Sequence, residues 1–136
     1  MLAASKLNMT LLIAAKCNDG ILLGAESAKL DSGTGVWSND GVKWHQGERG
    51  GSPFALTFGG EAQIGDNIST LSLLEMACQI VGGSLEANIA KTIKESLEKE
   101  YTQGEFVNDV ARQDFLKTAV VTVHLAKGSQ IGRAHV

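Results

Sequence analysis

A threonine stands directly behind a methionine, Met9-Thr10, at the start of a short apolar run. If Met9 is the true start, its removal would make Thr10 the N-terminal residue, and a small second residue permits that removal. A free α-amine has a pKa near about 8, so it can act as a general base at neutral pH. Thr10 would then carry a nucleophilic hydroxyl and its base on one residue. Alternatively, Thr10 is an ordinary β-forming residue of a strand.

Two charged residues are candidates to support that hydroxyl. A Lys43 ammonium beside Thr10 would depress the pKa of the hydroxyl and of the amine. Glu26 ends an apolar run, where a carboxylate needs a partner, and an ion pair with Lys43 would satisfy both groups. Simpler roles stay open, because most strand lysines are solvated and a carboxylate at a strand end can reach water.

Two glycines supply a third candidate feature. Gly59 and Gly60 are expected to end a strand and open a helix. A backbone N–H of Gly59 near the positive end of a helix dipole would suit an oxyanion hole. The alternative is a tight strand-to-helix turn without a chemical role. His45 and His124 lack partners at metal-ligand spacing, so we expect neither a metal nor a cofactor.

Composition narrows the class of protein. The 136 residues suit one domain or part of a larger one, and 43% hydrophobic with 20% charged residues is typical of a globular chain. A net charge of -3 offers no bulk attraction to nucleic acid or to an anionic membrane. Cys17 and Cys78 are too few for a disulfide framework, which favours a reduced, intracellular compartment.

The first half of the chain is predicted to be mostly strands. Residues 10–17 and 21–26 form a β-hairpin around a turn at 18–20. Residues 31–41 and 47–53 are polar or glycine-rich and are predicted to be loops. Between them, residues 42–46 form a short strand, with Val42 and Trp44 on one face and Lys43 and His45 on the other. Residues 54–58 form the next strand.

Two helices and a strand are predicted to follow. Apolar residues recur at helical spacing over 61–81, and Gly82-Gly83 is expected to end that helix. Ser84 is the predicted N-cap of a second helix, in which apolar residues repeat every fourth position as far as Tyr101. Residues 118–128 form a final strand. Strands followed by a helix pair indicate an α+β layered domain.

The last six residues, 131–136, could be encoded by a DNA sequence that does not belong to a gene. The codons ATC GGA AGA GCA CAC GTC would encode residues 131–136, and this run resembles the start of a common sequencing-library adapter. An ordinary basic tail is the alternative. We expect residues 130–136 to be a non-native tail on a truncated reading frame and leave them out of the fold prediction.

From Met9 to about Gly128 the arrangement resembles the N-terminal half of a proteasome-type subunit, β-like and bacterial, of the Ntn-hydrolase family of threonine peptidases. The most specific part is Thr10, a strand, a glycine turn and the segment GILLGAESA at 20–28. VKWH at 42–45 resembles the lysine segment of the family, and FALTFGGEAQIGD at 54–66 resembles its strand-to-helix turn. The Met-Thr start is similar to that of bacterial members with little or no propeptide.

The resemblance implies a role for each candidate residue. Thr10 would be the nucleophile, Lys43 would tune its pKa, Glu26 would orient Lys43, and the Gly59 N–H would hold the oxyanion. The implied fold is the N-terminal part of a four-layer αββα sandwich that is incomplete at the C-terminus. Residues 1–9 would be a short leader or a mis-called start, and residues 10–129 the partial domain.

The resemblance also implies an assembly. Copies of this chain or related subunits would form a stacked cytoplasmic ring, fed with unfolded polypeptide by an ATPase unfoldase and without a nucleic-acid or membrane partner. A non-catalytic α-type ring subunit is the alternative, because Glu26 stands where catalytic members usually carry Asp. A small-molecule Ntn amidase is a further alternative. The chain as given is expected to be inactive and to aggregate, because one sheet face would lack its cover.

Overall fold

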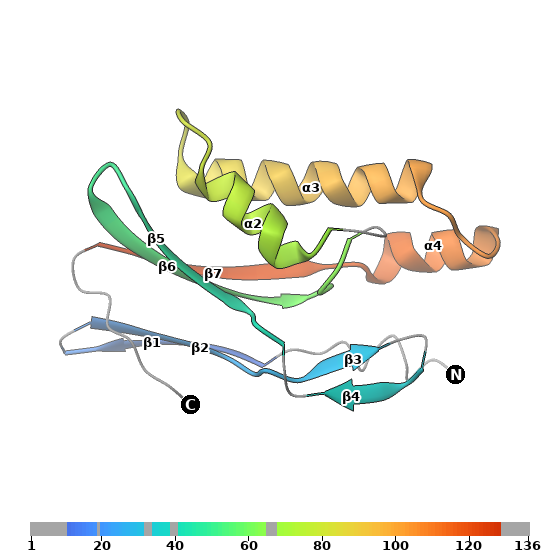
Figure 1. The fold of residues 1–136 in the computed structure, drawn as a ribbon, viewed down its shortest axis with the longest axis horizontal. Helices are drawn as coiled ribbons and strands as arrows, with labels where there is room; N and C mark the ends of the chain where they lie inside the picture. The colour runs from blue at the N-terminus through green and yellow to red at the C-terminus, as the bar shows by residue number, and fades with distance from the viewer. Residues whose placement is uncertain (1–10, 19, 32–33, 39–40, 65–67, 129–136) are drawn as a thin grey trace. The chain divides into compact units, whose positions relative to one another are not determined.

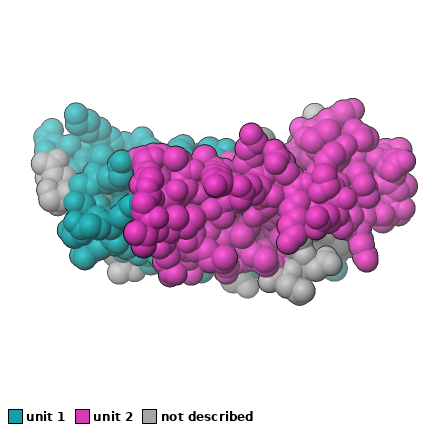
Figure 2. Space-filling model, turned by 90° about the horizontal axis from the view of Figure 1, so that it is seen from above, with its two compact units in different colours: residues 1–60, 122–136 teal, residues 61–121 magenta. Residues whose placement is uncertain are grey.

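The computed structural model describes residues 11–18, 20–31, 34–38, 41–64 and 68–128. The chain divides into two compact units, which Figure 2 shows in different colours. Residues 1–60 and 122–136 belong to the first unit, and residues 61–121 to the second. Strands make up the first unit and helices dominate the second (Figure 1).

The first two strands form the predicted hairpin. Strand β1, Leu12–Cys17, pairs antiparallel with β2, Gly20–Ala25, in a register that joins Cys17 to Gly20. The hairpin prediction is therefore confirmed over these residues. Thr10, which was expected to open β1, lies outside the described residues.

A second, shorter hairpin follows. Strand β3, Lys29–Asp31, pairs antiparallel with β4, Val36–Ser38, so that Leu30 lies opposite Trp37. The prediction of an unbroken loop over 31–41 is wrong here. Pairing of an apolar side chain with an aromatic one across the strands stabilises this hairpin. The polar residues around the pair gave no sign of a strand.

The third hairpin replaces another predicted loop. Strand β5, Trp44–Arg49, pairs antiparallel with β6, Ser52–Gly60, and only Gly50 and Gly51 connect them. These glycines have φ of 59° and 81°. Two consecutive residues with positive φ make the turn whose twist matches a two-residue hairpin, and glycine adopts it at little cost. The loop predicted over 47–53 is therefore strand at both ends.

Strand β7, Val121–Lys127, completes a three-stranded sheet in the order β5-β6-β7. Gly128 N donates to Pro53 O at 3.0 Å, next to the end of β7. The buried apolar residues of this sheet are Phe54, Leu56, Phe58 and Ala126. Strands β1 and β2 also contact β6, so β6 is the central element of the first unit (Figure 1).

The first helix is shorter than predicted. Helix α2 spans Thr70–Cys78, with Ser69 as its N-cap and Gln79 as its C-cap, rather than 61–81. The Ser69 side chain accepts a hydrogen bond from Ser72 N at 3.1 Å. A capping serine begins a helix more effectively than the Gly-Asp-Asn sequence at 65–67, which consists of poor helix formers. The described apolar residues upstream of Ser69, Ile64 and Ile68, are therefore not helical.

The second helix agrees with its prediction. Helix α3 spans Leu85–Gln103, and the Ser84 side chain accepts from Ala87 N at 3.1 Å, which confirms Ser84 as the N-cap. Leu85, Ile89 and Ile93 are buried. Helices α2 and α3 contact each other, so the apolar face of α3 packs within the helical unit. Gly82 and Gly83 lie between the two helices and do not end α2 themselves.

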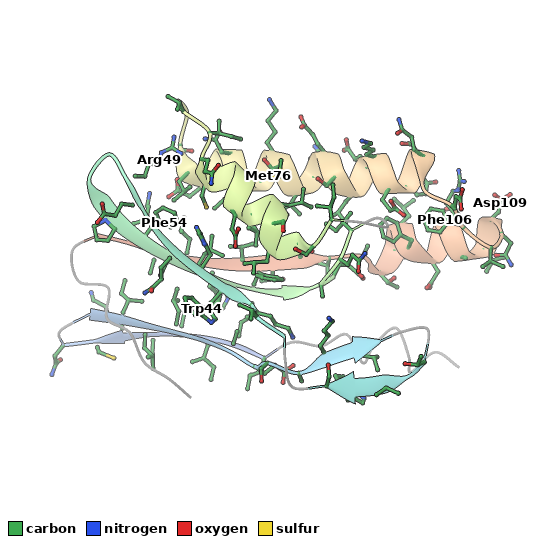
Figure 3. The ribbon with its side chains drawn as sticks, viewed as in Figure 1. Trp44, Arg49, Phe54, Met76, Phe106 and Asp109 are labelled. Atoms are coloured by element: carbon green, nitrogen blue, oxygen red, sulfur yellow. The ribbon has the colours of Figure 1, made fainter. Side chains whose placement is uncertain are left out.

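A third helix, α4 at Asp109–Thr118, was not predicted. None of its residues is buried, so burial of an apolar face does not stabilise it. Interactions between residues close in sequence stabilise this helix. Asn108 caps it by accepting from Ala111 N at 2.9 Å, and the rings of Phe106 and Phe115 lie 5.5 Å apart. Figure 3 labels Phe106 beside this helix.

The described residues thus form a mixed α+β structure with antiparallel sheets and three helices. Within these same ranges, no helix is both long and apolar enough to cross a membrane.

Helix α2 offers a matched pair of substitutions. Leu74 is completely buried, whereas Met76 on the same helix is 58% exposed. We expect Leu74→Ala to lower the free energy of unfolding by ~2–5 kcal/mol, because it leaves a cavity. Met76→Ala should change it by ~0.5 kcal/mol or less. Urea unfolding followed by circular dichroism measures both, and equal effects would contradict the packing described for α2.

Candidate functional site

The candidate site is centred on Lys43, which lies just before β5. Only 6% of this residue is exposed, whereas its neighbours Val42 and Trp44 are 54% and 45% exposed. The alternation predicted for this strand is therefore confirmed, with the charged residue on the buried side. A buried ammonium needs a hydrogen-bond acceptor. Lys43 Nζ has one, because it donates to Ala28 O at 2.5 Å.

Backbone hydrogen bonds hold the segment around Lys43 on both sides. Gly41 N donates to Ser27 O at 3.0 Å, just beyond the end of β2. Phe58 N donates to Lys43 O at 3.0 Å from the middle of β6. The position of Lys43 is thus set by β6 and by the segment that follows β2, both distant in sequence from it.

Gly41 allows this segment to approach the end of β2 closely. A Cβ atom at position 41 would lie 2.9 Å from Ser27 O and 3.6 Å from Lys43 Cε. The first distance is too short for a carbon beside a backbone oxygen. A glycine is therefore needed at position 41 if the ammonium is to reach the Ala28 carbonyl.

Glu26 is the second charged residue of the site. It is half-buried, and its backbone N donates to Leu11 O at 3.2 Å, which extends the β1–β2 register by one pair. Burial lowers the pKa of Lys43, and the negative charge of Glu26 acts in the opposite direction and raises it. The backbone of Glu26 is hydrogen-bonded to that of Leu11, the residue that follows Thr10.

Two opposing effects act on the Lys43 ammonium. Loss of water on burial lowers the pKa of Lys43 below its ordinary value of 10.5, and the negative charge of Glu26 partly opposes this shift. Burial has the larger effect. Lys43 therefore gives up its proton more readily than a solvated lysine does.

The remaining predicted residues have different outcomes. Thr10 lies outside the described residues, so its distance from Lys43 is not part of this geometry. Gly59 lies buried inside β6, and α2 begins only at Thr70. The expectation that Gly59 ends a strand and opens a helix is wrong, because β6 continues through Gly60 and irregular backbone follows. No helix dipole adjoins the Gly59 N–H.

Sequence patterns did not point to the Ala28 carbonyl or to Gly41. A backbone acceptor has no sequence signature, and a glycine required by a close approach resembles any loop glycine. Within the described ranges, no cluster of His, Cys, Asp and Glu side chains could hold a metal ion. The ring of His45 packs at a tilt against that of Phe54, with ring centroids 5.9 Å apart.

Comparison of the chain with protein-family models, with curated proteins and with solved structures found no match.

The lowered pKa of Lys43 predicts a specific pH dependence of stability. Between that pKa and 10.5, the unfolded chain binds more protons at Lys43 than the folded protein does. Stability therefore rises with pH across this window, as the cost of the buried charge is relieved. Lys43→Met should remove this contribution, whereas Lys16→Met, at an exposed lysine, should leave it intact. Urea midpoints from about pH 8 to pH 11 test this; identical profiles for the two variants would contradict it.

Gly41 gives a second test of the site. Gly41→Ala should displace the segment that carries Lys43, because its Cβ would meet Ser27 O at 2.9 Å. Gly24→Ala is the matched control, since a Cβ there would make an ordinary 3.9 Å contact with Ile13 Cβ. We expect Gly41→Ala to destabilise the protein by ~1–3 kcal/mol and Gly24→Ala by less than ~1 kcal/mol. Thermal unfolding of both variants decides whether the close approach exists.

Proposed function

We propose that the chain is the N-terminal-threonine peptidase subunit of a proteasome-like ring, with Thr10 as the nucleophile. The observation that carries the proposal is the buried Lys43 ammonium, bonded to the Ala28 carbonyl and attracted by Glu26. A protein rarely buries a lysine at a strand end between exposed apolar neighbours for stability alone, because the loss of hydration is costly. The hydrogen bond from Glu26 N to Leu11 O brings this pair beside the segment that carries Thr10.

In this proposal, catalysis begins when residues before Thr10 have been removed. The Thr10 hydroxyl loses its proton to its own amine, and its oxygen attacks the carbonyl carbon of the scissile peptide bond. The leaving nitrogen takes the proton, and an acyl-ester remains on Thr10. A water then attacks the ester with the amine as base, which frees the acid product and restores the hydroxyl. The Lys43 charge favours ionisation of the hydroxyl throughout.

Glu26 and Gly59 would act around Thr10 and Lys43 and would not take part in bond making or breaking. Glu26 orients the ammonium in this proposal. The Gly59 N–H is the oxyanion donor that the resemblance implies, and it would have to leave the β6–β7 pairing to take that role. The same proposal includes the four-layer Ntn-hydrolase fold and a cytoplasmic ring of copies or related subunits. It also includes an ATPase unfoldase as partner and an unfolded polypeptide as substrate. The order of elements along the chain, with antiparallel hairpins first and the α2–α3 helix pair after them, supports the proposed fold.

Glu26 also favours a second candidate, a non-catalytic α-type-like ring subunit. A glutamate has one more methylene than the usual catalytic aspartate, which moves its carboxylate away from the backbone. In that case Lys43 and Glu26 would form a structural ion pair. Thr10 would stay inside the chain and would have no free amine.

Covalent labelling separates the two candidates. We expect a β-lactone to acylate Thr10 of the assembled, full-length gene product and N-terminal sequencing of that product to begin at Thr10. Thr10→Ala should abolish labelling and Thr10→Ser should retain it. Lys43→Met should slow labelling by at least about 100-fold, because the hydroxyl loses the charge that favours its ionisation. Lys16→Met is the control and should label at the rate of the unmodified sequence.

Two outcomes would contradict the peptidase. If the label is absent and residues 1–9 remain on the assembled protein, the non-catalytic subunit is supported instead. If Lys43→Met labels as fast as Lys16→Met, the buried ammonium has no role in the chemistry.

A further inference from the structure

The register of β6 and β7 brings two polar side chains to opposite positions. Gly128 N donates to Pro53 O at 3.0 Å at one end of the pair, and Glu61 N donates to Val120 O at 2.9 Å at the other. Equal lengths of chain separate these bonds in the two strands, so both bonds fit one antiparallel register. Thr57 and His124 are midway between the bonds and therefore lie directly opposite each other.

Each of these residues has an unpaired polar atom. Thr57 Oγ1 and His124 Nδ1 are both buried, and neither has a hydrogen-bond partner among the described residues. Only 4% of Thr57 is exposed. A buried polar atom without a partner is costly, and such atoms are uncommon in native structures. Two of them on opposite residues of neighbouring strands are not expected by chance.

The chemistry of the two groups is complementary. A threonine hydroxyl can donate a hydrogen bond, and an uncharged imidazole accepts one at the nitrogen that lacks a proton. Directly opposite residues of antiparallel strands have Cβ atoms about 4.5–5.5 Å apart and side chains on the same face. Rotation of the Thr57 side chain about its Cα–Cβ bond redirects Oγ1, and a shared water can bridge a separation that is too long for a direct hydrogen bond.

We propose that Thr57 and His124 form a cross-strand polar pair in which the Thr57 hydroxyl donates to His124 Nδ1, directly or through one water. The bond places the proton of the imidazole on Nε2, so His124 has one fixed tautomer. This pair does not depend on the proposed peptidase function, because neither residue belongs to the Lys43 site.

The pair also specifies how β7 joins the sheet. Strand β7 returns to β6 after the whole helical unit, so local sequence does not determine its register. A slip by one residue would turn His124 to the other face and leave both polar atoms unpaired. Buried polar groups that can form their hydrogen bond in only one strand register make the other registers less stable. Thr57 and His124 are therefore positioning residues for the β6–β7 register.

Nuclear magnetic resonance of the folded full chain tests this directly. Long-range ¹H–¹⁵N spectra of the imidazole should show His124 with its proton on Nε2 alone. Thr57→Val removes the hydroxyl at nearly constant shape and should give a mixture of tautomers. It should also speed amide exchange of β7 about tenfold. Thr57→Ser should keep the fixed tautomer.

Thr122→Val is the matched control, since Thr122 lies on β7 two residues from His124 and is exposed. It should change neither the tautomer nor the exchange rates. A proton on Nδ1 in the unmodified protein would overturn the proposal, and that measurement needs no variant to fold. A Thr57→Val protein with the same single tautomer and exchange rates as Thr122→Val would overturn it as well.

Discussion

Burial of one positive charge is the constraint on which the candidate site depends. The Lys43 ammonium loses most of its contact with water, so the surrounding backbone and Glu26 must replace it. The Ala28 carbonyl accepts the hydrogen bond, and the Glu26 carboxylate supplies the compensating charge. Because that carbonyl lies beyond the end of β2, the ammonium reaches it only when the β1–β2 hairpin and β6 hold the Lys43 segment between them.

The same segment reverses the usual distribution of polar and apolar residues. Lys43 is buried, whereas Val42 and Trp44 on either side are largely exposed, and Figure 3 labels Trp44 at the start of β5. Folding for stability alone favours the opposite arrangement. Local conflicts of this kind occur where a protein has a functional requirement, since the cost must be offset by the rest of the fold. Burial of this lysine therefore lowers the stability of the fold unless its charge is compensated.

Sequence patterns predicted some elements better than others, for identifiable reasons. The β1–β2 hairpin and α3 were predicted because apolar periodicity and a capping serine are local signals. Helix α4 was missed because it buries none of its residues, and the β5–β6 turn was missed because Gly50-Gly51 occurs within a polar segment. Helix α2 was predicted too long, since apolar spacing continued upstream of its true N-cap, Ser69.

The sequence by itself determined which residues could do chemistry and which face of its strand each would occupy, because side chains alternate along any extended chain. It indicated Glu26 as a partner for Lys43 through the need of a carboxylate for a counter-charge. Tertiary structure decided that Lys43 is buried, that the Ala28 carbonyl binds its ammonium, and that Gly59 lies within a strand. These facts depend on contacts between segments far apart in the chain, and backbone acceptors and close approaches leave no pattern in the order of the residues.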